Sequence, residues 1–295
     1  MDNTNPQIPL GFAFWLSLAW IALIALSAST VQWWPVPVPD KMDWDHLSAI
    51  PGPASANALS QNNAEKAGSP YIHYLGTDTK GRDLLSRAVY GARISLSVGV
   101  AAPLIGLFVG GLLGCLAGFY QGAVESSIVA AMDIILAFPG LVLLLAVTFY
   151  LGANLQNLIL SLGFLTVPAF CRVARAKTLA LSRLDFVQAA RLSGAGSRTI
   201  LFREIIPNVM VPVAIYGLLV VAFMIMAEGA LSFLGLGIPA PTPSWGGMIA
   251  EGREVLEQAP QISMIPAIIM FLTVIAFNLI GDSLRSHFER GKRQL

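Results

Sequence analysis

Long stretches without charge are the feature of this sequence that most restricts its fold. Residues 134–171 contain no Asp, Glu, Lys or Arg. That is too long for one helix across a bilayer, whose hydrocarbon core takes about 20 residues. The turn sequence Gly152-Ala153-Asn154 divides the stretch into two spans. Over the whole chain the sequence predicts six spans, at residues 10–34, 94–120, 128–151, 155–172, 205–234 and 262–280.

Composition agrees with a membrane protein. Hydrophobic residues make up 55% of the chain and charged residues 12%, whereas soluble proteins average about 25% charged residues. Helices satisfy their own backbone hydrogen bonds in lipid, so we expect an all-α, polytopic membrane protein with six transmembrane helices. The charges are segregated by segment and form no single basic face. Membrane lipid is therefore an expected partner and nucleic acid is not.

Basic residues indicate how the spans are oriented. They concentrate in residues 172–203 and 285–293, and such intervals tend to lie in the cytoplasm. Six spans place both intervals, and both termini, on that side. The basic run Lys80, Arg82, Arg87 and Arg93 falls on the opposite side. Acidic residues in the same long loop offset them, and the rule is weak for long loops.

The spans divide the chain into four predicted parts. These are a first segment with its span (1–34), an extracytoplasmic loop (35–93), a five-helix core (94–285) with a cytoplasmic loop at 173–204, and a cytoplasmic tail (286–295). In the outer loop, Thr79 is the predicted N-cap of a short amphipathic helix in which Asp83 and Arg87 pair four residues apart. In the second span, small-residue spacing predicts close helix contact at Gly106, Gly110, Gly111, Gly114 and Gly118.

A polar, basic interval, residues 182–209, separates apolar segments in the second half of the chain. Gly194 is predicted to end a short helix there, because glycine adopts the left-handed conformation without steric cost. Ser197 is the predicted N-cap of the helix that follows. We expect a helix, a tight turn and a helix where the protein contacts a soluble partner. The predicted apolar side of the first helix consists of Phe186, Val187, Ala189, Ala190 and Leu192.

This interval resembles the cytoplasmic coupling loop of ABC importer permeases. Gln188-Ala189-Ala190, Gly194 and Ile206-Pro207 occupy positions of that pattern, with Gln188 in place of the usual Glu and Glu204 in place of the usual Ile. The family's loop docks on a separate ATPase subunit. The resemblance therefore implies that such a subunit contacts Asp185, Gln188, Ala189, Ala190, Gly194, Ile206 and Pro207. The alternative is a basic loop without this role.

A second resemblance, spread over residues 74–285, is to the permeases of dipeptide, oligopeptide and nickel importers. It is carried first by Gly76-Thr77-Asp78, Gly81-Arg82-Asp83, Ser86-Arg87 and Tyr90-Gly91-Ala92-Arg93. It implies the type I ABC importer permease fold in a bacterial inner membrane, and half of a pathway for peptides or related small solutes. The implied partners are a second homologous permease, two ATPase subunits and a periplasmic or lipid-anchored substrate-binding protein. ATP and Mg²⁺ would bind the ATPase subunits, and this chain would bind no cofactor and catalyse no reaction.

Three acidic residues in or beside the spans need an explanation, since a charge at the centre of a membrane helix costs roughly 2.5–3.5 kcal/mol. Asp133 is predicted about a turn from the cytoplasmic end of span three, where we favour a role at a subunit interface over substrate contact. Glu228 lies near the outer end of span five and either lines the pathway or bonds a neighbouring helix. Asp282 is predicted to cap or pair near the inner face.

Other functional classes lack their residues in this sequence. It has no Gly-x-x-x-x-Gly-Lys-Ser/Thr phosphate loop and no His-Glu-x-x-His. Cys115 and Cys171 lie in apolar segments and are predicted to be packing residues, and no metal site is predicted. The alternatives are an ion-coupled secondary transporter, which needs intramembrane ion ligands and usually an internal repeat, and, less favoured, a membrane enzyme.

Overall fold

The computed structural model describes residues 11–44, 46–51 and 73–292 of the chain. Within these ranges all regular secondary structure is helical, as predicted, apart from two isolated antiparallel bridges, Met42 with Arg82 and Thr77 with Asp83. The parts of the predicted outer loop at 45 and 52–72, the first ten residues and residues 293–295 lie outside the described residues.

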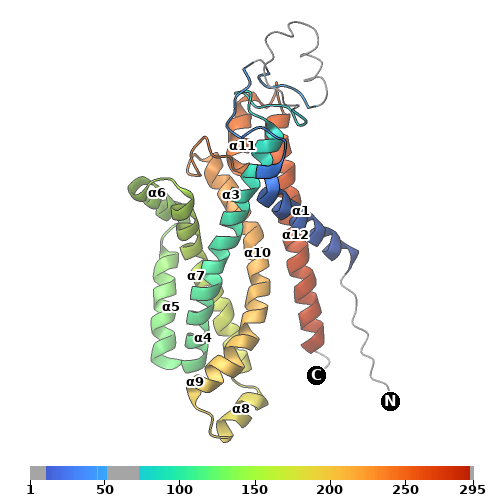
Figure 1. Cartoon of the computed structure of the whole chain (residues 1–295). Coiled ribbons are helices and arrows are strands. Elements are labelled where there is room, and N and C mark those ends of the chain that lie inside the picture. The colour runs from blue at the N-terminus through green and yellow to red at the C-terminus, as the bar shows by residue number, and fades with distance from the viewer. Residues whose placement is uncertain (1–10, 45, 52–72, 293–295) are drawn as a thin grey trace, which may run out of the picture.

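The helices run along one long bundle (Figure 1). Helix α1 (Phe12–Thr30) continues as a 3₁₀ turn, Val31–Trp33. One long rod consists of α3 (Leu84–Ile105), a π-helical turn (Gly106–Gly110) and α4 (Gly111–Tyr120). The chain continues through α5 (Gly122–Ala137), α6 (Gly140–Leu151), α7 (Leu155–Leu181) and α8 (Asp185–Leu192). A second rod consists of α9 (Ser197–Thr199), a π-helical turn (Ile200–Ile205) and α10 (Ile206–Phe233), before α11 (Trp245–Gly252), a 3₁₀ turn (Arg253–Val255) and α12 (Gln261–Lys292).

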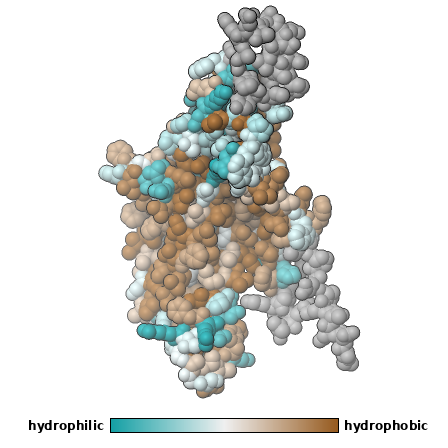
Figure 2. Space-filling model, in the orientation of Figure 1, coloured by the Kyte–Doolittle hydropathy of each residue, from teal (hydrophilic) through white to brown (hydrophobic). Residues whose placement is uncertain are grey.

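Five helical stretches, including the two rods, are long and apolar enough to cross a membrane. Helices α5 and α6 give a sixth if that pair counts as one span. Hydrophobic surface forms a broad band between hydrophilic ends (Figure 2). The predicted third span is wrong in one respect, because α5 and α6 are bent by 76° where they meet. Phe138 is extended there, as sterics favour for a residue that precedes a proline, and Pro139 follows it.

The start of α3 also differs from the prediction. It lies at the end of the bundle opposite α8 (Figure 1); that end is named the outer end and the α8 end the inner end, after the predicted orientation. The helix starts at Leu84 and continues to Ile105, so the predicted short amphipathic helix is its first part. Its N-cap is Asp83, whose carboxylate accepts from the backbone N–H of Ser86 at 2.7 Å. Thr79 is not the cap, and Asp83 does not pair with Arg87.

The inner ends of three helices extend beyond the predicted spans. Helix α7 continues to Leu181 and the second rod begins at Ser197, so the loop between them is shorter than residues 173–204. Helix α12 continues to Lys292, so residues 286–292 are helical rather than a separate tail. Polar side chains end the apolar stretch but do not end a helix, because they can face water or one another.

Glycines allow the first rod to lie directly against α7. Added Cβ atoms at Gly110, Gly114 and Gly118 would meet backbone carbonyl oxygens of α7, and one at Gly106 would meet Thr166 and Phe170. The close contact predicted from small-residue spacing is therefore confirmed for these four positions. Gly111 faces Met210 on α10 instead.

Helix α11 returns from the outer end of α10 and packs beside α3 (Figure 1). Trp245, its first residue, is fully buried and donates from Nε1 to the carbonyl oxygen of Ala88 at 2.9 Å. This contact fixes the outer segment between α10 and α12 against the start of α3. Helix α8 lies at the opposite end of the bundle.

Candidate functional site

Helix α8 is anchored to the inner end of the bundle through one side. Val187 is fully buried in an apolar cluster that also contains Leu181, Ile200 and Ile205. Ala190, one turn further along α8, packs at the edge of the same cluster. The short helix is therefore held by the ends of α7 and of the second rod.

The other side of α8 faces solvent. Phe186 is 40% exposed and Leu192 90% exposed, and Ala189 is exposed as well. Only part of the predicted apolar side is buried against this chain, because only Val187 and Ala190, three residues apart, share the buried face. Exposed apolar groups on a surface helix mark an interaction site when they cluster. Of the other predicted coupling residues, Asp185, Gln188, Gly194 and Pro207 are exposed, and Ile206 is half-buried.

The turn after α8 depends on Gly194. Its φ is +81°, in the left-handed region. The N–H of Gly194 donates to the carbonyl of Arg191 at 3.0 Å, and that of Ala195 donates to the carbonyl of Ala190 at 3.1 Å. This pair of bonds is the Schellman ending of a helix. The next helix is capped by Gly196, one residue before the predicted Ser197.

Glu228 is fully buried near the outer end of α10. Its carboxylate accepts from the hydroxyl of Ser95 on α3 at 3.0 Å and from the hydroxyl of Ser232 at 2.8 Å. The Ser95 hydroxyl in turn accepts from the backbone N–H of Trp245 at 3.2 Å. Glu228 thus bonds a neighbouring helix, one of the two arrangements considered from the sequence, and through Ser95 it is linked to α11.

Helices α5 and α7 are joined by two ion pairs. Asp133 lies 2.8 Å from Arg172, and Glu125 pairs with Arg175. Because α5 begins at Gly122, Asp133 lies about three turns into the helix. Its distance from the membrane surface stays a prediction. Arg172 belongs to α7, within the span predicted at residues 155–172.

Asp282 does not cap a helix, because α12 continues past it. It is exposed and has no hydrogen bond or ion pair within the described part of the chain.

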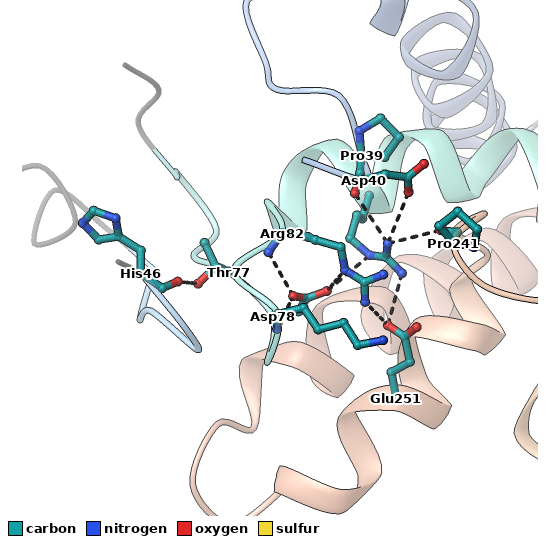
Figure 3. Close-up of polar contacts among 10 residues, drawn as sticks. Pro39, Asp40, His46, Thr77, Asp78, Arg82, Pro241 and Glu251 are labelled. Atoms are coloured by element: carbon teal, nitrogen blue, oxygen red, sulfur yellow. Dashed lines mark hydrogen bonds and ion pairs between the residues drawn. The ribbon is translucent and has the colours of Figure 1, made fainter. Parts of the chain in front are cut away.

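A buried ion cluster at the outer end was not predicted from the sequence (Figure 3). The side chains of Arg82 and Arg87 are both 2% exposed, and both donate to one oxygen of Glu251, at 2.7 and 3.1 Å. Asp78, equally buried, accepts from Arg82 Nε at 2.7 Å and lies 3.5 Å from Arg87 Nε. Asp40, half-exposed, lies 3.9 Å from Arg87. The cluster joins Asp40 and Asp78, which precede α3, to the start of α3 and to α11.

One signal for this cluster was present in the sequence. Asp78 and Arg82 stand four residues apart in the motif that carried the second resemblance. Glu251 lies far along the chain, however, and nothing in its local sequence identifies it as the shared acceptor.

A second polar cluster joins Asp43, His46 and His73 to Asp83, the N-cap of α3. Asp43 lies 3.1 Å from His46 Nδ1 and 3.4 Å from His73 Nε2, and His73 Nδ1 lies 2.9 Å from Asp83. The bond to Asp83 raises the pKa of His73 above its ordinary value of 6.5, against the opposing effect of burial. Among the described residues, no group of three His, Cys, Asp or Glu side chains could hold a metal ion.

The stability of the contacts that join Asp43 and His73 to Asp83 is expected to depend on pH through His73. A raised folded-state pKa means that the stabilisation is complete below about pH 6.5. It is lost as the pH rises through the folded-state pKa. Thermal unfolding of the purified protein in detergent from pH 6 to 9 should therefore show a falling midpoint. His73→Gln should flatten this profile, whereas His287→Gln on exposed α12 should not; equal profiles for all three proteins would refute the assignment.

Comparison with known proteins decides the family. Residues 110–294 match the model of the family described as "Binding-protein-dependent transport system inner membrane component". The chain belongs to this family. It is 37% identical over 265 residues to the glutathione transport system permease protein GsiD of Pectobacterium atrosepticum, covering 90% of this chain and 82% of that protein. It is 43% identical over 213 residues to GsiD of Escherichia coli O157:H7, covering 72% and 70%.

The fold agrees with that of a solved permease. A chain of the MetNI methionine ABC transporter, in inward-facing conformations, superposes with a TM-score of 0.52 at 16% identity, covering 68% of this chain and 96% of that chain. This binding-protein-dependent permease is thus a transmembrane subunit of an ABC importer and not an enzyme. The secondary-transporter and enzyme alternatives are not supported. The family match includes α8, the turn at Gly194 and the α5–α7 ion pairs.

Proposed function

We propose that this permease forms half of the pathway of an importer for peptides or related small solutes, and that α8 couples it to an ATPase subunit. The observation that carries the coupling role is the divided surface of α8. Val187 anchors the helix to the ends of α7 and of the second rod, while Phe186, Ala189 and Leu192 remain open to a partner. Movement of a docked ATPase subunit would pass through this helix to the bundle.

The proposed complex contains a second homologous permease, two ATPase subunits that bind ATP and Mg²⁺, and a periplasmic or lipid-anchored substrate-binding protein. The family's description names the binding protein and the inner membrane. For the solute, the support is the name of the relatives, which are glutathione transport permeases. Uptake of labelled glutathione and of dipeptides into cells with and without this gene tests the substrate class directly.

Protection of one cysteine tests the coupling surface. Both native cysteines are buried, so Leu192→Cys supplies an accessible thiol on α8. Bound ATPase subunits should slow its reaction with a maleimide strongly. Leu256→Cys, an exposed position in the outer segment, is the control and should react at the same rate with and without them. Unchanged reactivity at Leu192→Cys in the assembled complex would exclude α8 as the docking surface.

Both termini are expected in the cytoplasm of a bacterial inner-membrane protein. Arg183, Arg191, Arg198 and Arg203 lie at the α8 end of the bundle. The opposing basic residues Arg82 and Arg87 are buried against acids, so they contribute little net charge. Alkaline phosphatase, which is active only outside, should be silent when fused after Leu295 and active when inserted after Glu257. Activity after Leu295 would contradict this topology.

Glu228 is expected to be needed for the structure of the outer half of the pathway. Glu228→Gln keeps an acceptor for Ser95 and Ser232 and should assemble and transport. Glu228→Leu leaves both hydroxyls without their acceptor, at about 1–3 kcal/mol for each unsatisfied buried group, and should lower membrane abundance and uptake. Glu257→Leu, an exposed position, is the matched control. Normal abundance and uptake in Glu228→Leu would mean that the buried carboxylate has no such role.

A further inference from the structure

Basic residues gather where two candidate spans meet the inner end of the bundle. These spans end at Leu181 on α7 and begin at Ser197 on the second rod. Within two turns of these ends, or in the connection between them, lie five exposed cations that we name the basic collar: Lys177, Arg183, Arg191, Arg198 and Arg203. The same range contains two acidic residues, Asp185 and Glu204. The collar therefore carries an excess of positive charge.

This chain does not neutralise the basic collar. Arg172 and Arg175, which precede it on α7, are used in the pairs with Asp133 and Glu125. Within the described residues, no side chain of the collar forms an ion pair. Cations that lie near one another and lack acids favour a partner with negative charge.

Exposed apolar side chains stand directly beside two of these cations. Leu184, next to Arg183, is 50% exposed, and Phe202, next to Arg203, is 59% exposed. At a membrane surface, apolar groups of this kind enter the boundary of the acyl chains while arginine heads reach the headgroups. Hydrophilic surface borders the apolar band directly at the end that carries α8 (Figure 2). The collar is thus continuous with the surface that faces lipid.

The surface proposed for the ATPase subunit lies elsewhere on the same segment. On α8, Asp185, Ala189 and Leu192 are exposed at a spacing that places them on one face. The one cation of this helix, Arg191, lies outside that face, with its guanidinium 5.9 Å from the ring centroid of Phe119 on α4. It is therefore directed back toward the bundle and not toward a subunit that docks on the exposed face.

We infer that the basic collar binds the phosphate groups of anionic phospholipids in the leaflet at the inner end of the bundle. The inference goes beyond the proposed function, because it requires neither solute nor ATP. Guanidinium groups donate to phosphate in a bidentate manner. A zwitterionic headgroup carries its own cation, so the collar should prefer lipids with net negative charge. Each basic residue near an anionic membrane surface contributes roughly a fivefold increase in the binding constant.

Quenching by brominated lipid tests this binding in the assembled transporter. Both native cysteines are buried, so a fluorophore can be attached specifically at Phe202→Cys, beside Arg203. The transporter is reconstituted with brominated phosphatidylglycerol or brominated phosphatidylcholine, whose bromine atoms quench a fluorophore that they contact. We expect phosphatidylglycerol to bind at least about tenfold more tightly at this position, the effect of two cations reduced by salt. Leu23→Cys, similarly exposed on charge-free α1, is the control and should be quenched equally by both lipids.

Substitution of the cations tests which charges are responsible. Arg183→Gln and Arg203→Gln should each lower the preference for phosphatidylglycerol about fivefold, and Arg203→Lys should retain it. Arg253→Gln removes an exposed arginine at the outer end and should leave it unchanged.

Two results would overturn the inference. Equal quenching by both lipids at Phe202→Cys would show that the collar does not select anionic headgroups. Absence of quenching by either lipid would show that an ATPase subunit or a partner permease covers the collar. Protection of Leu192→Cys by the ATPase subunits in the same membranes reports separately on the proposed function, so the two can fail independently.

Discussion

Asp78→Ala is expected to destabilise the protein by about 3–5 kcal/mol, the range for removing one partner of a buried ion pair. The carboxylate is 2% exposed and accepts from Arg82 Nε and from the backbone N–H groups of Lys80 and Arg82 at 2.7–3.0 Å. Without it, Glu251 is the one carboxylate among the described residues that pairs with both guanidinium groups, and less of their mutual repulsion is offset. The midpoint of thermal unfolding in detergent should fall, and amide exchange at the start of α3 should accelerate.

Asp40→Ala is the matched control for this prediction. Asp40 belongs to the same cluster, but it is 46% exposed and lies 3.9 Å from Arg87. An exposed ion pair contributes about 0–1 kcal/mol, so its loss should hardly change the midpoint. Asp78→Asn keeps an acceptor for the backbone N–H groups and should lie between the two. Equal effects of Asp78→Ala and Asp40→Ala would show that burial does not determine the strength of this cluster.

Gly194→Val is expected to weaken binding of the ATPase subunits about tenfold. A left-handed conformation costs an L-residue about 1–2 kcal/mol, most for a β-branched one, and 1.4 kcal/mol is a factor of ten in binding. No atom lies within 4 Å of an added Cβ at Gly194, so the strain comes from φ and not from a clash. The valine should tilt α8 away from the position fixed by Val187. The measurements are recovery of ATPase subunits with the purified permease and solute-stimulated ATP hydrolysis in proteoliposomes.

Two variants isolate the backbone effect. Asn tolerates the left-handed region better than other non-glycine residues, so Gly194→Asn should retain most of the docking. Gly196, two residues further on, has φ −67° and equally open surroundings, so Gly196→Ala should bind normally. Full ATPase recovery and stimulation in Gly194→Val would show that this turn does not set the coupling geometry.

The inner and outer ends of the bundle differ in how they are held together. At the outer end, Asp78 and Glu251 fix α3 to α11 through two buried arginines. At the inner end, α8 is held by one buried side chain, Val187, and by the packing of Ala190 and Ala195. Fewer buried contacts mean a lower free energy for local opening. This contrast suits an inner element that moves with a partner and an outer end that stays closed around the start of α3.

The sequence by itself determined most of the membrane-spanning helices, the family and the helix–turn–helix segment around Gly194. Charge-free length predicts spans because a bilayer leaves no other way to satisfy the backbone, and Gly194 identified its turn because only a few residue types accept positive φ. These signals are local, so they survive without knowledge of the fold. The glycine positions that approach α7 could also be read from their spacing.

Only the tertiary structure decided which residues meet across the chain. Glu251 joins Arg82 and Arg87, Arg172 pairs with Asp133, and Asp83 caps α3 instead of pairing with Arg87. An ion pair between distant segments depends on helix register and on which faces are buried, and neither is encoded near either partner. The same holds for α8, where packing against α7 and the second rod, and not residue polarity, selected Val187 and Ala190 as the buried side and left Phe186 and Leu192 exposed.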